Sequence, residues 1–370
     1  MKNILDEMAP VDYTLQMGAG ALMSEFGKYG KRADEKVDQV MATKLDKKIL
    51  LVYNPHSGHN SFRNKLHDCI SVFQGAGYET HIYCMLENGG VDLHIAGIPA
   101  GFYDAIAVSG GDGTLSIVIN SLLLHGHNTP VLVIPSGTAN DFATSLNIPR
   151  DAEGACMLIH NAPVHCDVGL VNGRYFLNVC AVGFLADISQ VVDKGLKNSL
   201  GNIAYYLTLL GKLSALTPLR VKITTSSNVF EEDIYLFLAL NSSSIGGFSN
   251  LSPNASVSDG RFDFIVVKAV QLADFAMIMI KLLSGEHLSD PNIIYFQDNY
   301  VKVEKLTESG GGGSGEGAGV GVGGVGVGAG GGVTDMDGEI GPGLPIVIEN
   351  RSNALRIFTP GTLGISNDKN

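Results

Sequence analysis

The sequence lacks several features that define common classes of protein. Its five cysteines form no C-x-x-C pair, and their odd number argues against a disulfide framework or a zinc site. No stretch approaches the roughly 20 apolar residues of a membrane-spanning helix, and the start MKNILDEMAP is acidic where a signal peptide needs an apolar core. With 25 basic and 37 acidic residues, the net charge of −12 argues against a general nucleic-acid binder. We therefore expect a cytoplasmic protein in a reducing compartment.

The order of apolar segments predicts two kinds of architecture in one chain. Its 370 residues, 45% of them apolar, suffice for two domains. From Lys48 onward strands alternate with helices, which indicates a doubly wound parallel sheet. From about Val164 strands dominate, and Asn172-Gly173 is a strong signal for a tight hairpin. An α/β half should therefore be followed by a mostly antiparallel β half.

Two segments stand apart from this pattern. Residues 1–47 are polar and of mixed charge, and we interpret them as an N-terminal appendage. Residues 310–332, GGGGSGEGAGVGVGGVGVGAGGG, are of low complexity and cannot bury a core. We expect this insert to be a disordered surface loop.

Three turns rich in glycine and small residues end strands in the first half. They are NPHSG (54–58), GGDGT (110–114) and PSGTANDFA (135–143). Glycine lets a ligand approach the backbone amides closely, and the unpaired N–H groups and dipole of a helix start favour phosphate. Because the carboxyl ends of parallel strands share one edge, the turns can face a single nucleotide. Each turn alone could be a simple connection, but the three together favour a phosphate site.

Other phosphate-binding patterns are absent from the chain. There is no P-loop G-x-x-x-x-G-K-[ST], and no G-x-G-x-x-G dinucleotide fingerprint occurs outside the low-complexity insert 310–332. The H-R-D and D-F-G motifs of protein kinases are missing as well. A different kind of nucleotide site is therefore indicated.

Taken together, the motifs resemble the diacylglycerol kinase catalytic domain family, specifically its soluble bacterial lipid-kinase branch. The resemblance covers about Lys48 to Pro360 and includes, in the family's order, NPHSG, GGDGTLSIVIN, PSGTANDFA, VGF, SLGNIAYYLTLL, LSPNASVSDGRFDFIVV and DMDGEIGPGLPIVIE. It implies an ATP-binding α/β domain over 48–163 and 351–370, to which the strand LRIFTP would return. It also implies a β-sandwich-like lipid-substrate domain over 164–350, with the active site in the cleft between the two.

The resemblance also implies roles for individual residues. The positions that match the nucleotide site are Asn54, Pro55, His56, Ser57, Gly58, Gly110, Gly111, Asp112, Gly113, Thr114, Leu115, Ser116, Gly137, Thr138 and Asn140. Those that match a magnesium–water network are Asp112, Asp141 and Asp167, and a second, structural magnesium site would involve Ser256, Asp259 and Arg261. Asp337 and Glu339 match the acidic motif that supplies the catalytic base, and of the two we favour Asp337.

The chemistry of phosphoryl transfer agrees with these assignments. Magnesium and backbone amides neutralise phosphate charge, and a carboxylate accepts the proton of the alcohol. Taken singly, each aspartate has an ordinary structural alternative: Asp141 could cap a helix, and Asp259 and Asp337 could each form a turn before a glycine. Two departures from the family are His59, where lysine is frequent, and Met85, near an expected threonine.

We therefore expect a magnesium-dependent kinase that transfers the γ-phosphate of ATP to a lipid hydroxyl, above all that of diacylglycerol. Its partner should be a lipid at the inner face of the membrane, which it would touch only peripherally, and a homodimer is an option. Two alternatives remain at this point. One is an NAD kinase-like enzyme, whose fold also uses a GGDG turn, and the other is a non-catalytic regulator that binds nucleotide or lipid.

Overall fold

A computed structural model describes most of the chain from Leu45 to Gly361. The described residues are 45–58, 61–86, 90–183, 217–243, 251–253, 255–306 and 332–361. Several expectations concern residues outside these ranges. They are the appendage up to residue 44, the motif SLGNIAYYLTLL, the glycine insert up to residue 331, and His59.

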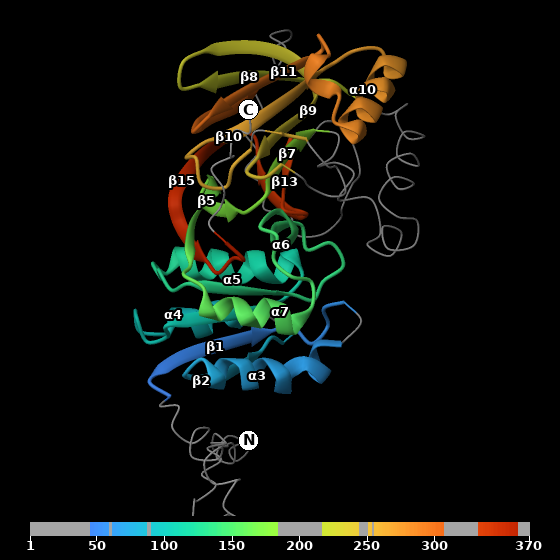
Figure 1. Cartoon of the computed structure of the whole chain (residues 1–370). Coiled ribbons are helices and arrows are strands. Elements are labelled where there is room, and N and C mark those ends of the chain that lie inside the picture. Colours follow the sequence, from blue (N-terminus) through green and yellow to red (C-terminus); the bar gives the residue numbers. More distant parts are fainter. Residues whose placement is uncertain are drawn as a thin grey trace, which may run out of the picture. The chain divides into compact units, whose positions relative to one another are not determined.

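The first half of the chain forms a parallel sheet with helices packed on it (Figure 1). Its strands are β1 (Lys47–Tyr53), β2 (Tyr78–Cys84), β3 (Ala105–Gly110) and β4 (Val131–Pro135), in the spatial order β2-β1-β3-β4. The helices are α3 (Leu66–Gly75), α4 (Val91–Ala96), α5 (Asp112–Leu124), α6 (Asp141–Ser145) and α7 (Ala152–Met157). β3 and β4 are buried along their whole length, as strands covered on both faces must be. We call β1–β4 and these helices the α/β region.

The second half is built mainly from antiparallel strands, which we call the β-rich region. The strands are β5 (Val164–Val171), β6 (Arg174–Phe176), β7 (Val179–Gly183), β8 (Leu219–Thr225), β9 (Val229–Leu240), β10 (Phe262–Lys268), β11 (Ile293–Asp298), β12 (Tyr300–Lys305), β13 (Val333–Met336) and β14 (Glu339–Gly343). They surround a core of their own, which includes Phe176, Phe237 and Phe264. Together with the parallel sheet, this confirms the predicted fold class.

One long strand, β15 (Ile346–Ile357), joins the two regions. Its first residues pair antiparallel with β12, and its length pairs with β5. Its last residue, Ile357, pairs parallel with Val131 of β4. The strand LRIFTP therefore returns to the α/β region as expected, and one continuous sheet runs through both regions.

Local sequence signals explain where several elements end. Asn172 and Gly173 have φ values of 47° and 91° and form the predicted hairpin between β5 and β6. Helix α4 ends at Ala96. Gly97 and Pro99 follow, and a residue before proline disfavours the helical conformation.

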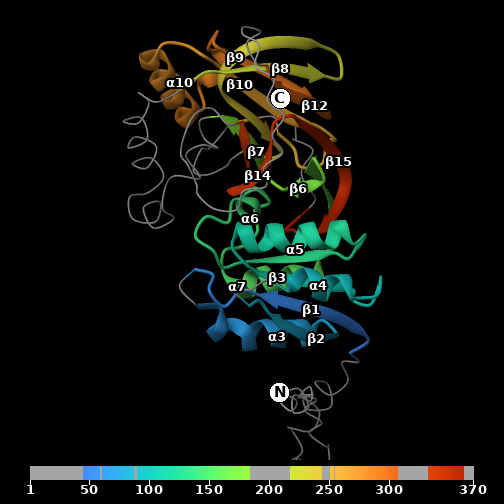
Figure 2. The ribbon, with the colours of Figure 1, turned by 180° about the vertical axis from the view of Figure 1, so that it is seen from behind.

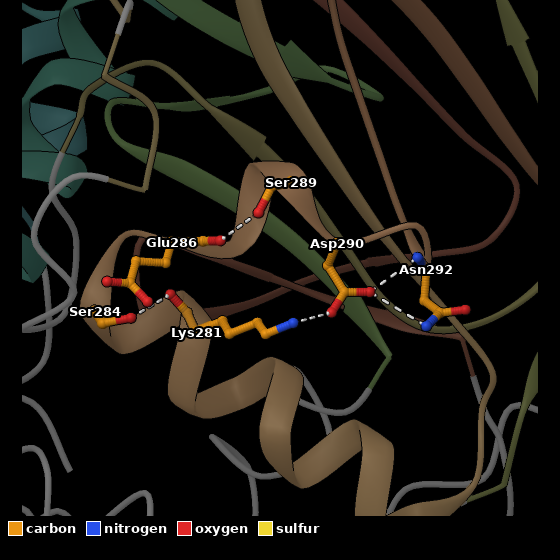
Figure 3. A network of polar contacts seen from close by, with 6 residues as sticks. All are labelled: Lys281, Ser284, Glu286, Ser289, Asp290 and Asn292. Atoms are coloured by element: carbon orange, nitrogen blue, oxygen red, sulfur yellow. Dashed lines mark hydrogen bonds and ion pairs between the residues drawn. The ribbon is translucent and has the colours of Figure 1, made fainter.

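Helix α10 (Leu272–Ser284) packs its apolar stripe against the β-rich sheet (Figure 2). Phe275, Ile278, Met279 and Leu282 are buried at helical spacing. A polar network follows its C-terminal end, where Lys281 Nζ lies 2.7 Å from Asp290 Oδ2 (Figure 3). The hydrogen bond from Lys281 lowers the pKa of the Asp290 carboxyl below its usual range. None of the helices in the described ranges is long and apolar enough to cross a membrane.

Candidate active site

The three glycine turns meet at the carboxyl edge of the parallel sheet. A Cβ atom on Gly137 would lie 2.4 Å from the Cα of Gly111, and one on Gly58 would lie 2.3 Å from the carbonyl oxygen of Ser136. Ser136 N also donates to the carbonyl oxygen of Gly110 at 3.0 Å. Because no Cβ fits at these distances, glycine is required where the backbones of neighbouring turns touch. The predicted turns thus form one continuous backbone surface.

Side chains lock the first turn onto the second. Asn54 Nδ2 donates to Thr114 Oγ1 at 3.0 Å, and Asn54 Oδ1 accepts from His56 N at 2.9 Å. Thr114 is itself buried at the start of α5, beside Gly110. Two of the predicted nucleotide residues, Asn54 and Thr114, therefore hold the shape of the turns.

The third turn closes on itself through Asn140. This residue has a φ of 54°, and its Oδ1 accepts from Gly137 N at 3.0 Å while its Nδ2 donates to Gly137 O at 2.8 Å. Asparagine is one of the few residues that adopt this left-handed conformation readily. The amide of Asn140 is thus used within the turn. The sequence-based expectation of a nucleotide contact there stays a prediction.

Asp112 and Asp141 open two helices at the same edge. Asp112 is the first residue of α5, and its Oδ1 accepts from Phe142 N at 3.2 Å, which ties the start of α5 to the start of α6. Asp141 is the first residue of α6. Acidic residues are favoured in a first helical turn because they face the positive end of the helix dipole. The structure therefore brings these two predicted magnesium residues together.

Asp337 lies in the turn between β13 and β14, with a φ of 54°. Its Oδ2 accepts from Leu177 N at 2.6 Å, and its Oδ1 accepts from Asn178 N at 2.8 Å and Val179 N at 3.0 Å. Burial raises the pKa of this carboxyl to about 6, although the three N–H bonds oppose the shift and the charge of Asp112 adds to it. Asp337 is thus both anchored and close enough to Asp112 to sense its charge.

Glu339 faces the α/β region directly. A Cβ atom on Gly113 would lie 3.4 Å from Glu339 Oε1, so this carboxylate stands against the first turn of α5. In both ribbon views α5 and α6 lie beside the part of the β-rich region that carries β6, β13 and β14 (Figures 1 and 2). Gly338 between the two acids has a φ of 86°, and its N donates to Asp335 Oδ1 at 2.9 Å. The acidic turn therefore meets the glycine turns, as its predicted role requires.

The other predicted metal residues lie close to one another. Asp167 is fully buried; its Oδ2 accepts from Gly260 N at 2.7 Å and its Oδ1 from Asn353 N at 2.8 Å. Asp259 Oδ1 accepts from Arg261 N at 3.0 Å, and the pKa of Asp259 is raised by burial and by the charges of neighbouring aspartates, Asp167 among them. Ser256 Oγ contacts Ser258 in the same turn. Asp167 thus lies with the 256–261 turn, where it bonds backbone N–H groups.

No group of three His, Cys, Asp or Glu side chains suited to a metal occurs among the residues that the structure describes. Magnesium, however, usually takes one or two carboxylates together with waters and substrate phosphates. The pair formed by Asp112 and Asp141 fits this kind of donor set. Both magnesium sites remain predictions at this point.

Two features of the site were not found by sequence reasoning. The backbone N–H groups of 177–179, which hold Asp337, leave no trace in a sequence. Asn120 bonds both the N and the O of Tyr175, at 2.8 and 3.0 Å. The sequence did offer a signal for Asn120, because this residue is the last one of the motif GGDGTLSIVIN.

Family models match nearly all of the described chain. One that is described as the diacylglycerol kinase catalytic domain matches residues 48–171. A second, described as the YegS C-terminal NAD kinase beta sandwich-like domain, matches residues 178–359.

Individual proteins with this similarity include two curated bacterial ones named diacylglycerol kinase. The protein of Bacillus subtilis strain 168 is 37% identical over 259 residues, which are 70% of this chain and 86% of that protein. The protein of Staphylococcus aureus strain RF122 is 31% identical over 329 residues, 88% of this chain and 97% of that protein. A crystal structure of a diacylglycerol kinase from Bacillus anthracis strain Sterne is 26% identical, with a TM-score of 0.65, and the match covers 85% of this chain and 97% of that one.

Proposed function

This chain belongs to the bacterial diacylglycerol kinase family and is an ATP-dependent lipid kinase, and we propose that its acceptor is the free hydroxyl of diacylglycerol. The product would be phosphatidic acid. The observation that carries the proposal is the approach of Glu339, from the acidic turn, to Gly113 in the glycine turn. A phosphate held on the glycine turns would thereby face a carboxylate from the opposite region.

The reaction consists of three events at this site. The acceptor oxygen attacks the γ-phosphorus, the bond from that phosphorus to the oxygen of ADP breaks, and the proton of the hydroxyl passes to a base. Backbone N–H groups of the glycine turns and the start of α5 are suited to the phosphate charge. A carboxylate on the other side is suited to the proton. Positioning and charge stabilisation account for most of the catalysis in such transfers.

Within the acidic turn we assign the proton to Glu339. Both oxygens of Asp337 accept backbone N–H groups, which fixes this carboxylate as the anchor of the turn. Glu339 instead stands against Gly113 at the start of α5. Although the sequence alone favours Asp337 as the base, the contacts support a positioning role for Asp337 and a catalytic role for Glu339.

Magnesium is part of the proposal. Asp112 and Asp141 would hold it, since their carboxylates open the two adjoining helices and suit a hydrated, hard cation. When bound, the metal supplies neutralisation of phosphate charge. The turn with Ser256, Asp259 and Arg261 would hold the second, structural ion.

The site of action follows from the substrate. Diacylglycerol resides in a bilayer, so we propose that the protein works peripherally at the cytoplasmic face of the membrane. A homodimer stays a prediction.

The test is transfer of label from γ-labelled ATP in the presence of magnesium. The full chain is offered diacylglycerol in mixed micelles and, separately, a sphingoid base, phosphatidylglycerol and NAD. We expect labelled phosphatidic acid. Label on NAD would favour the NAD kinase alternative, and binding of ATP without transfer to any acceptor would favour the regulator.

A further inference from the structure

Helix α5 contacts the β-rich region through one side chain near its middle. Asn120 follows Asp112 by about 12 Å along the helix axis. Its Oδ1 accepts from Tyr175 N at 2.8 Å, and its Nδ2 donates to Tyr175 O at 3.0 Å. A primary amide that bonds both the N–H and the C=O of one residue satisfies the groups that a neighbouring strand would otherwise bond. The helix that begins with the glycine turn is thus joined to β6.

The amide of Asn120 is also held from its own helix. Its Nδ2 donates to Ser116 O at 3.0 Å, one turn earlier. The two protons of Nδ2 are thereby both used, and Oδ1 has its own donor. These hydrogen bonds fix the orientation of the Asn120 side chain. Asn120 can therefore hold the helix and the strand at a defined distance from each other.

The strand held by Asn120 leads directly to the anchor of the acidic turn. Two to four residues after Tyr175 come Leu177, Asn178 and Val179, whose N–H groups bind the carboxylate of Asp337. One short segment, 175–179, is therefore bonded on one side by α5 and on the other by the β13–β14 turn. No other side-chain bond between α5 and β6 is found among the described residues.

The geometry points to Asn120 as a positioning residue that sets the spacing between the phosphate-binding start of α5 and the acidic turn. This inference rests on the proposed function and deepens it. Asn120 acts through Tyr175 and the 177–179 segment and does not need to touch substrate. The continuous sheet through β15 joins the two regions independently. Loss of the Asn120 bonds should therefore alter the spacing while the fold persists.

The chemistry of the side chain makes the role specific to asparagine. Alanine at position 120 removes both bonds to Tyr175. Aspartate keeps the size and can accept from Tyr175 N, but it places a second oxygen against Tyr175 O, where a donor is needed. Asn120→Ala and Asn120→Asp should therefore share a defect even though their sizes and charges differ.

The experiment measures kcat and KM for ATP with diacylglycerol in mixed micelles, together with the rise in Tm that magnesium-ATP induces. Ser121→Ala is the matched control, because Ser121 is the next residue of α5 and its Oγ donates to Asp92 Oδ1 at 2.7 Å within the α/β region. We expect kcat to fall about 10- to 100-fold in both Asn120 variants, since misplacement by about 1 Å can cost about 10²-fold. KM for ATP and the ATP-induced rise in Tm should stay within about twofold of the wild type.

Two results would overturn the inference. Asn120 variants whose kcat matches that of Ser121→Ala would show that the spacing does not depend on this side chain. If kcat and the affinity for ATP fall by the same factor in the Asn120 variants, Asn120 has a general structural role and does not set the spacing. If one Asn120 variant fails to fold, the other decides the question. A wild-type protein that phosphorylates no lipid would instead refute the proposed function, and this is measured first.

Discussion

On the α/β side of the candidate site backbone packs against backbone, whereas on the β-rich side carboxylates bind backbone N–H groups. Gly58 and Gly137 leave no room for a Cβ at the touching turns. Asp337 holds its turn with three hydrogen bonds to a distant segment. The glycine turns offer a ligand backbone N–H groups next to Asp112 and Asp141, and the acidic turn offers carboxylates at fixed positions on the opposite side. A phosphate donor and an alcohol acceptor need these two environments.

This difference predicts how each side fails. On the α/β side, a substitution that adds volume to a glycine turn should abolish function even though no charge changes. The acidic side should lose function through lost charge or lost acceptors, with its volume unchanged. The following substitutions test that contrast in order of decreasing effect.

Glu339→Gln should have the largest effect. It keeps the shape of the side chain but removes the proton acceptor beside Gly113. We expect kcat to fall about 10²–10⁴-fold, the range for loss of a general base. KM for ATP and Tm should change little, because the glycine turns are untouched. Steady-state kinetics and thermal unfolding measure these quantities.

Glu349→Gln is the matched control, since Glu349 pairs with Arg351 at an exposed place on β15. Its kcat should equal that of the wild type. If Glu339→Gln keeps its turnover while Asp337→Asn loses turnover at unchanged Tm, the base is Asp337, as the sequence alone favoured.

Gly137→Ala should be next. The new Cβ would lie 2.4 Å from the Cα of Gly111, so the two turns must separate. We expect kcat/KM to fall by about 10²-fold through loss of ATP binding, which the ATP-induced rise in Tm reports. Gly75→Ala in α3 is the same chemical change at a site with nothing within 4 Å, and it should keep full activity. Equal behaviour of the two variants would refute the idea of a glycine-dependent surface.

The two sides also differ in how much of them the sequence predicts. The glycine turns carry local signals, and strand order alone places them at one edge, so Gly111 and Gly137 could be expected to meet. The parallel sheet and the hairpin at Asn172-Gly173 were predicted for the same reason, whereas the return of β15 was predicted through the family resemblance. The acidic turn was predicted only through the family resemblance. Its anchoring depends on N–H groups of 177–179, more than 150 residues away in the chain, and no local pattern records such a contact.

Asp337→Asn should affect stability more than the chemical step. An asparagine amide has one acceptor oxygen, so its NH₂ group would face one of the N–H donors of 177–179. We expect the free energy of unfolding at pH 7 to fall by about 1–3 kcal/mol, the cost of a buried group left without its partner. Denaturant unfolding measures it. An Asp337→Asn protein as stable as Glu339→Gln would contradict the anchoring role.

The pH dependence of that stability difference gives the smallest and most specific effect. Asp337 has a pKa of about 6 in the folded protein, against about 3.9 for an ordinary aspartate. The folded state therefore binds this proton more tightly, and the contribution of Asp337 to stability is greatest below about pH 4. It declines as pH rises to about 6 and is constant above.

The stability of the wild type relative to Asp337→Asn should thus fall by on the order of 1 kcal/mol between pH 4 and pH 6.5, because the variant lacks the titrating group while the other carboxylates cancel in the comparison. Gly137→Ala, which changes no charge, should show no such trend against the wild type. A flat difference for Asp337→Asn would mean that the three N–H bonds balance burial, so that the pKa of this carboxyl is the same in the folded and the unfolded protein.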